Sequence, residues 1–263
     1  MSNILVVREE STMNAVLDDI LRTGRVQSPS GQLFEAQAHS IAREEGEFLQ
    51  SLIYKADPTV SLEVGLAYGV STLFICDALH KRPETRHIVI DPDQHSVWEG
   101  IGMRNLQAAG YQELIELHTM PSFRALPQLE AQGLRVDFAF IDGWHTFDYA
   151  FVDFYFIDKL LNVGGIVVLD DANWPAIRKL CRYIATNHAY TPICMADAPD
   201  RRISRKKRLL NMAMRFPYLS RKLPTTLRSE LIETDARLGL WGACIAFLKE
   251  SEDTRRWDFY QRF

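Results

Sequence analysis

The sequence predicts an α/β protein whose core is a doubly wound, mostly parallel sheet of seven strands, with an antiparallel last strand. Three observations lead to this prediction. Short apolar segments alternate with helical segments from about residue 60 onward. Several of these apolar segments are uninterrupted, as in strands that are buried on both faces of a parallel sheet. The chain has 263 residues, which is enough to bury such a core in one large domain.

Apolar periodicity predicts each element in order. A first helix is expected over residues 33–54, and residues 1–32 are expected to be an N-terminal extension to the domain of residues 33–263. Five strands and five helices then alternate along the chain. The expected strands cover residues 60–64, 86–91, 114–118, 136–142 and 166–169, and the expected helices cover 70–81, 95–109, 122–132, 146–161 and 174–187.

The regular alternation stops after a strand that is expected near residues 190–195. Residues 197–237 are predicted to be an insertion, which precedes a final antiparallel edge strand over 240–248. From Arg201 to Lys222 this insertion contains nine Lys or Arg residues and no Asp or Glu. A solvated loop, a lid over a substrate pocket, and a contact with anionic lipid or an acidic partner are all compatible with this composition.

Composition excludes several classes of protein. The net charge of −4 gives no sign of nucleic-acid binding. The four cysteines are scattered without a CxxC pair, which argues against a zinc site and a disulfide framework and favours a reducing compartment. No apolar run reaches the length of a membrane span, and the first residues lack the features of a signal peptide. We therefore expect a cytoplasmic protein, with a homodimer as the default assembly.

A glycine-rich turn, EVGLAYGVS, follows the first strand of the predicted sheet. Gly65 and Gly69 allow a tight turn and a close approach to a ligand, and the next helix offers free N–H groups to an anion. Asp91 ends the second strand, where it could accept hydrogen bonds from a ribose diol. The dinucleotide fingerprint G-x-G-x-x-G fits poorly, because Ala67 and Val70 stand at its second and third glycine positions. A turn without a ligand is the other alternative.

Acidic residues follow the fourth and fifth predicted strands. Asp142 ends the fourth strand, and Asp170 and Asp171 end the fifth, which is its neighbour in the expected strand order. Carboxylates that converge in this way are either partly protonated or bound to a cation, and oxygen ligands suit magnesium, manganese or calcium. His145, three residues after Asp142, is a candidate general base. Helix capping by the acids and a structural role for the histidine are the alternatives.

The glycine turn and the acidic cluster together resemble class I S-adenosylmethionine (SAM)-dependent methyltransferases, which have a Rossmann-like fold. The segment 62–71 resembles the catechol and caffeoyl-CoA O-methyltransferases. Asp142, His145 and the pair at 170–171 match the positions of their metal ligands and base, and Trp144 matches the tryptophan before the base. A histidine at this position, where the catechol enzymes have lysine, resembles bacterial sugar O-methyltransferases that act on macrolide glycosides. The resemblance covers about residues 35–195 and the last strand.

The resemblance implies a role for each candidate site residue. The methionine end of SAM would lie around Glu63, Gly65 and Ser71, its ribose at Asp91, and its adenine near Met120 and Ser122. A divalent cation, most simply magnesium, would be held by three carboxylates, and His145 would be the catalytic base. The complete cofactor set is Glu63, Gly65, Ala67, Gly69, Ser71, Asp91, Met120, Ser122 and Asp142, and the metal set is Asp142, Asp170 and Asp171.

The implied activity is the transfer of a methyl group from SAM to a hydroxyl of a small molecule, either a sugar or a catechol-like diol. Two other functions stay open. One is a metal-independent class I O- or N-methyltransferase whose acids bind a substrate amine. The other is a non-catalytic SAM-binding interaction protein that uses the basic insertion, although such a protein would have no need of the acidic cluster and His145.

Overall fold

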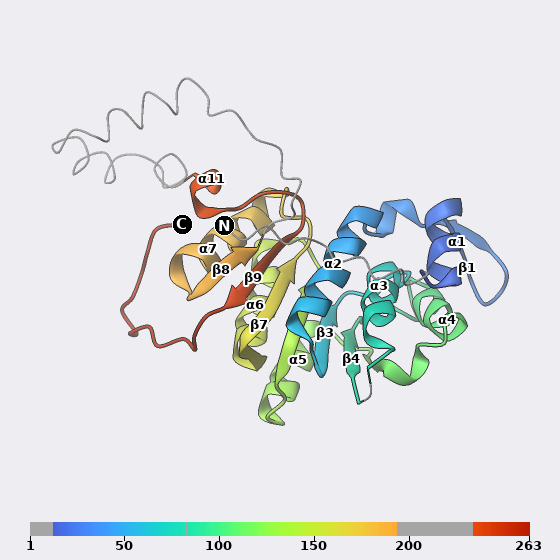
Figure 1. The fold of residues 1–263 in the computed structure, drawn as a ribbon, viewed down its shortest axis with the longest axis horizontal. Helices are drawn as coiled ribbons and strands as arrows, with labels where there is room; N and C mark the ends of the chain where they lie inside the picture. Colours follow the sequence, from blue (N-terminus) through green and yellow to red (C-terminus); the bar gives the residue numbers. More distant parts are fainter. Residues whose placement is uncertain (1–12, 83, 194–233) are drawn as a thin grey trace, which may run out of the picture.

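The computed structural model describes residues 13–82, 84–193 and 234–263 (Figure 1). Its centre is a seven-stranded sheet in the order β5-β4-β3-β6-β7-β9-β8. Six strands run in one direction, and β9 runs antiparallel to both of its neighbours. The predicted fold class is therefore confirmed. The strands are β3 (Val60–Val64), β4 (Arg86–Ile90), β5 (Ile115–His118), β6 (Val136–Ile141), β7 (Leu161–Leu169), β8 (Tyr190–Ile193) and β9 (Ile245–Lys249).

Helices cover both faces of the sheet. One face packs against α2 (Arg43–Ala56), α3 (Val70–Leu79) and α4 (Ile101–Ala108), and the other against α5 (Ser122–Ala131), α6 (Phe147–Leu160) and α7 (Pro175–Asn187). Side chains of the central strands alternate between the two cores, so that Phe140 joins the first and Ala139 the second. This two-sided burial explains why the strands are apolar throughout, since each fully buried phenylalanine contributes about 1.5–3 kcal/mol.

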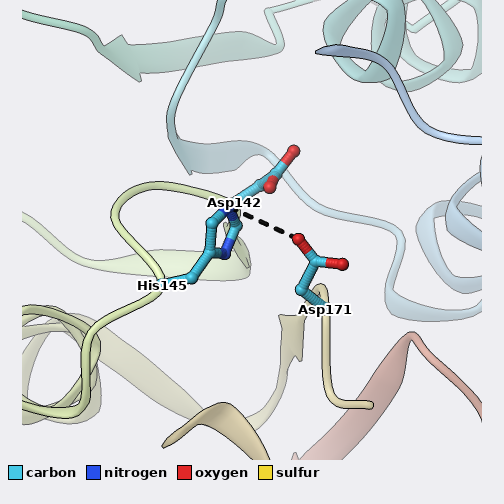
Figure 2. Close-up of side chains that lie close together, drawn as sticks. All are labelled: Asp142, His145 and Asp171. Carbon is cyan, nitrogen blue, oxygen red and sulfur yellow. Dashed lines mark ion pairs between the residues drawn. The ribbon is translucent and has the colours of Figure 1, made fainter. Parts of the chain in front are cut away.

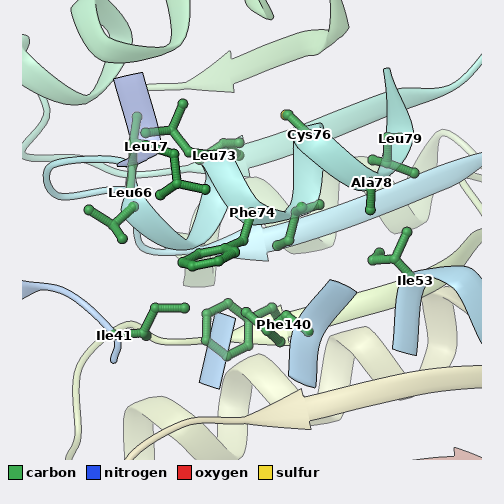
Figure 3. Packing of buried hydrophobic residues seen from close by; sticks show 14 of the residues in the cluster. Leu17, Ile41, Ile53, Leu66, Leu73, Phe74, Cys76, Ala78, Leu79 and Phe140 are labelled. Atoms are coloured by element: carbon green, nitrogen blue, oxygen red, sulfur yellow. The ribbon is translucent and has the colours of Figure 1, made fainter. Parts of the chain in front are cut away.

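The core on the α2 and α3 side is built around Phe74 and Phe140, which lie close together in Figure 3. Gly46 allows α2 to approach α3 here, because a Cβ atom at this position would lie 2.2 Å from the Phe74 ring. The close approach brings the N-terminal turn of α2, including Glu45, toward the carboxyl ends of the strands. The Glu45 side chain accepts a hydrogen bond from the Ala42 N–H at 3.0 Å and so caps this helix.

The helix predicted to begin at residue 33 begins instead at Arg43. Residues Leu33–Glu35 form β2, which pairs antiparallel with β1 (Arg25–Gln27), and the 3₁₀ helix η1 (Gln37–His39) follows. The prediction was wrong here because the turn at 28–31 closes a hairpin, whose ladder hydrogen bonds replace those of a helix. The preceding helix α1 (Ala15–Thr23) buries Leu17 and Ile20 in the core on the α3 side.

Three further boundaries differ from the prediction. The helix α4 begins at Ile101 rather than at 95, because residues 92–100 form turns that end at Gly100 with φ of +71°. The glycines at 164–165 lie inside β7, which begins directly after α6. The final strand begins at Ile245 and lies between β7 and β8 rather than at the edge. Residues 245–247 of β9 are fully buried on both faces, which an edge position would not allow. The edge strand is β8, which contains Pro192, a residue that sheets tolerate at an edge because it has no N–H to donate.

The predicted basic insertion of residues 197–237 lies outside the described residues, except for its end, where the short helix α11 (Asp235–Leu238) begins. Asp235 pairs with the buried Arg182 of α7 at 2.7 Å, which fixes α11 against that helix. Among the helices that the structure describes, none is long and apolar enough to cross a membrane.

Candidate active site

The candidate site lies where the strand order reverses. From β3 the chain continues to β4 and β5 on one side of the sheet, and then returns to β6 and β7 on the other. Ligands of open parallel sheets bind at the carboxyl ends of the strands at such a point. A cavity of about 460 Å³ is found there. It is lined by Val64, Gly65, Ala67, Ile90, Asp91, Pro92, Asp93, Trp98, Pro121, Ser122, Phe123, Asp142, Gly143, Trp144, Tyr149 and Asp153.

Gly65 brings the glycine turn into direct contact with the end of β6. Its φ is +98°, and a Cβ atom built on it would lie 2.1 Å from the backbone oxygen of Asp142. The Asp142 N–H donates to the Val64 carbonyl at 2.9 Å, so a hydrogen bond joins the two strand ends beside this contact. A glycine is therefore required at position 65, and it sets the position of Asp142 relative to the cavity.

We expect Gly65→Ala to destabilise the fold and to weaken ligand binding in the cavity. A left-handed conformation alone costs a non-glycine residue roughly 1–2 kcal/mol. The clash between the alanine Cβ and the backbone oxygen of Asp142 adds to this cost, because neither atom can move without moving the backbone. Gly110→Ala is the matched control, since Gly110 has φ of +82° but open space around a Cβ atom. Thermal unfolding should show a larger loss for Gly65→Ala; equal losses would contradict the steric argument.

Asp91 holds the glycine turn from the end of β4. Its Oδ2 accepts hydrogen bonds from the N–H groups of Leu66 and Ala67, both at 2.9 Å, and its Oδ1 accepts one from the Asp93 N–H at 2.8 Å. A carboxylate has roughly four acceptor positions, so about one is left for a ligand. Asp91 lines the cavity as well, which is compatible with the predicted ribose contact.

Glu63 and Ser71 meet beneath the glycine turn. The fully buried Glu63 carboxylate accepts hydrogen bonds from the hydroxyls of Ser71 and Thr72, at 2.5 and 2.6 Å, and interacts with His87 Nε2 at 2.9 Å. His87 in turn contacts the Ser61 hydroxyl at 2.8 Å through Nδ1. These bonds fasten β3 to α3 and β4, and they provide partners for a carboxylate that has no contact with water.

Asp142, His145 and Asp171 converge beside the cavity (Figure 2). Each offers one ligand atom, and the three atoms lie within 4.8 Å of one another. His145 Nε2 lies 3.4 Å from Asp171 Oδ2. Asp171 has φ of +50°, an uncommon conformation for a residue other than glycine, which turns the chain sharply after β7. The carboxyl ends of β6 and β7 thus place these side chains together, as their positions in the sequence predict.

The carboxylates of the site repel one another. Burial raises the pKa of Asp142 well above its usual range, and the neighbouring charges of Asp170 and Glu63 raise it further. Burial, followed by the charge of Glu45, raises the pKa of Asp170 to about 7. Asp170 is nearly buried and is not part of the close group of three. At neutral pH these carboxylates are therefore either partly protonated or neutralised by a bound cation.

The structure places some predicted cofactor residues at the cavity and others beneath it. Gly65, Ala67, Asp91, Ser122 and Asp142 line the cavity, whereas Glu63, Gly69, Ser71 and Met120 do not. Met120 is partly buried against the core on the α5 and α6 side. Gly69 has φ of +80° and begins α3.

Sequence reasoning missed several residues of the site. Trp98, Phe123, Tyr149 and Asp153 line the cavity, and Glu45 adds charge to the acidic group. Tyr149 and Asp153 are four residues apart on α6 and so lie on one face of it, which is a signal that the sequence contains. Trp98 and Glu45 come from a turn and from a helix of the opposite layer, and no local pattern marks them.

Comparisons with known proteins show similarity to methyltransferases. Residues 62–172, from β3 to the acid pair after β7, match the methyltransferase domain family. The chain is 30% identical over 132 residues to an Arabidopsis thaliana protein named for caffeoyl-CoA O-methyltransferases, covering 50% of this chain and 54% of that protein. It is 30% identical over 107 residues to the catechol O-methyltransferase of Niastella koreensis, covering 40% and 47%. The chain thus spans about half the length of these curated relatives.

The fold is also similar to that of solved structures. An O-methyltransferase from Bacillus cereus, crystallised in complex with S-adenosylhomocysteine (SAH), matches with a TM-score of 0.55 and 21% identity, over 72% of this chain and 85% of that one. At this identity the likeness concerns the fold alone. Residues 62–172 thus match a methyltransferase domain family, and the sheet has the same Rossmann-like fold as the solved O-methyltransferase.

Proposed function

We propose that this chain is a SAM-dependent O-methyltransferase that transfers a methyl group to a hydroxyl of a small molecule with the help of a divalent metal. One observation carries the proposal. Asp142, His145 and Asp171 gather ligand atoms within 4.8 Å of one another, and Asp142 also lines the cavity beside the glycine turn. The cofactor and the metal would therefore meet at Asp142.

The cavity supports SAM as the cofactor. It is lined by the glycine turn and by aromatic side chains, and the Bacillus cereus protein with the same fold was solved with SAH. Asp91 would face the ribose, and Ser122 would face the base, as the resemblance implies. The sulfonium methyl would then point toward Asp142 and His145.

The donor set fits a divalent metal such as magnesium. Its carboxylate oxygens suit a hard cation, and the raised pKa of Asp142 indicates negative charge that a cation would stabilise. Among the residues that the structure describes, no Lys or Arg forms an ion pair with the carboxylates at 142, 170 or 171. Asp142 and Asp171 would hold the metal, with Asp170 behind them adding charge.

Each residue of the site then has a chemical task. A divalent metal held by Asp142 and Asp171 would stabilise the negative charge that develops on the substrate oxygen. His145 would accept the proton of the substrate hydroxyl, the hydroxyl oxygen would form a bond to the methyl carbon, and the S–CH3 bond of SAM would break to release SAH. Asp171 Oδ2, at 3.4 Å from His145 Nε2, would stabilise the protonated imidazole that results. Most of the rate acceleration would come from orientation and from charge stabilisation.

An exposed aromatic side chain beside His145 supports a ring-shaped substrate. The Trp174 ring centroid lies 5.5 Å from that of His145, and 52% of the residue is exposed. Such a surface accepts the flat face of a sugar or of a catechol, so both substrate classes belong to this proposal. A homodimer, a cytoplasmic location and a lid formed by residues 197–237 stay predictions from the sequence.

Calorimetry tests the proposed function in two steps. SAH is titrated into protein that has been treated with EDTA, and magnesium is then titrated into the SAH complex. Binding of both is expected, and it would justify a screen of glycosides and catechols as acceptors with and without EDTA. Binding of SAH without magnesium would favour a metal-independent methyltransferase. If SAH does not bind, SAM-dependent transfer by this chain is excluded.

A further inference from the structure

A second group of metal-ligating side chains lies at the opposite end of the sheet from the candidate active site. Asp158 is in the last turn of α6, His188 follows the end of α7, and Asp253 is in the C-terminal segment after β9. Because α6 and α7 lead into β7 and β8, and β9 runs in the other direction, the three residues meet at the amino ends of the parallel strands. One ligand atom of each lies within 4.8 Å of the other two.

The atoms of Asp158 and His188 that face each other lack hydrogen bonds. The His188 side chain is 7% exposed and the Asp158 side chain is 10% exposed. Asp158 Oδ1 accepts a hydrogen bond from the Tyr190 hydroxyl at 2.6 Å, whereas Asp158 Oδ2 lies 3.8 Å from His188 Nδ1, which is beyond hydrogen-bond distance. Neither ring nitrogen of His188 forms a hydrogen bond within the part of the chain that the structure describes. Polar atoms in such a buried place normally have a partner, so this pair points to a ligand that both contact.

The spacing of these atoms suits a zinc ion. Zinc lies about 2.0–2.1 Å from a histidine nitrogen and about 2.0–2.2 Å from a carboxylate oxygen, so two such ligands can be up to about 4 Å apart. The separation of 3.8 Å between Asp158 and His188 is within this limit. Asp253 has capacity for a metal as well, because Arg255 donates three hydrogen bonds to it and a carboxylate has roughly four acceptor positions.

The charges around this group favour a metal that binds imidazole over a hard cation such as magnesium. Lys249 Nζ lies 3.8 Å from Asp158 Oδ1, and Arg255 pairs with Asp253 at 2.7 Å, so the charges of both acids are already offset. Burial, and then the charge of Arg255, lower the pKa of His188 to about 4. The ring is therefore neutral at pH 7, which is the form that binds a metal. Zinc accepts imidazole and carboxylate ligands together, whereas magnesium prefers oxygen ligands alone.

We infer that Asp158, His188 and Asp253 bind a zinc ion that fastens the C-terminal segment to α6 and α7. Three protein ligands leave the fourth zinc position to a water molecule. No cysteine takes part, so the cysteine spacing that argues against a zinc site does not apply to this group. The inference is independent of the proposed function, because the group lies at the other end of the sheet from the cavity and shares no residue with it.

The test measures zinc binding by calorimetry in a parent chain from which two active-site ligands have been removed by Asp142→Asn and His145→Ala. This parent is expected to bind one zinc ion even when magnesium is present in excess. His188→Phe keeps a ring among the neighbouring rings of Phe154 and Tyr190 but has no ligand atom. Adding it to the parent should lower the zinc affinity by about 100-fold or more, since even the outer partners of metal ligands contribute roughly 10- to 100-fold.

Two further variants separate binding from folding. Asp253→Asn changes a partly exposed ligand and leaves the buried ring in place, so it should lower the zinc affinity while the protein remains folded by circular dichroism. His80→Phe is the matched control, because the His80 ring also contacts a tyrosine, Tyr111, but lies at the opposite edge of the sheet; its zinc affinity should equal that of the parent.

Thermal unfolding gives a second measurement. Zinc should raise the melting temperature of the parent chain, because a ligand that binds only the folded state stabilises it, and it should not raise that of His188→Phe. A parent chain that does not bind zinc would overturn the inference. Zinc binding that is as tight in His188→Phe and Asp253→Asn as in the parent would overturn it too, since the metal would then lie elsewhere.

Discussion

Replacing Asp142 by asparagine is expected to abolish binding of the divalent metal and to lower kcat by about 100- to 1000-fold, the usual cost of losing one group that stabilises developing charge. Asp142 is the residue that joins the cavity to the acidic group. Asparagine retains its shape but offers the cation a neutral oxygen. Manganese binding, followed by electron paramagnetic resonance, measures the first effect, and methyl transfer to a responsive acceptor measures the second.

The same substitution should leave the metal-free protein as stable as the wild type or more stable. The pKa of Asp142 is raised in the folded chain, so folding disfavours its ionised form. This unfavourable contribution is present at pH values above the ordinary pKa of an aspartate, and it disappears as the pH falls below that value. At pH 7, Asp142→Asn should therefore not lower the melting temperature. Loss of activity together with a lower melting temperature would indicate a structural role instead.

Asp148→Asn is the matched control for this experiment. Asp148 lies in the first turn of α6, is exposed, and is not part of the close group that could hold a metal. Metal binding and activity should be close to wild type in this variant. If it reduced metal binding as strongly as Asp142→Asn does, general surface charge rather than the site would explain the result.

Replacing His145 by alanine is expected to lower kcat by about 100- to 10,000-fold, the usual contribution of a positioned general base. Metal and SAH should still bind if His145 acts as the base, because two carboxylates remain in the group. If His145 is a metal ligand instead, as its place within 4.8 Å of the other ligand atoms allows, manganese affinity should fall together with kcat. The two measurements made on one variant thus distinguish the two roles.

His80→Ala provides the control for His145. His80 ends α3 at the opposite edge of the sheet, where its ring contacts Tyr111. Since it lies far from the acidic group, its removal should affect stability more than kcat. Equal losses of kcat in both variants would show that the assay responds to folding rather than to the loss of a base.

Local patterns in the sequence were sufficient for the fold class. An apolar run that ends in a glycine or an aspartate marks each central strand, and the carboxyl ends of parallel strands lie at one edge of a sheet. The convergence of Asp142 with Asp171 follows from this geometry, as does the position of the glycine turn opposite β6. These features depend on backbone direction and periodicity, which a single segment of sequence encodes.

Tertiary packing decided the rest. β9 lies between β7 and β8, where its residues 245–247 are buried on both faces. The β1–β2 hairpin depends on a turn that competes with helical spacing. Glu45 and Trp98 reach the site from two separate elements, so no spacing along the chain reveals them. The sequence by itself determined the fold class and the acids at the strand ends, because both are local. Only the tertiary structure decided which strand lies at the edge and which aromatic side chains line the cavity, because both depend on the free energy of contacts between distant segments.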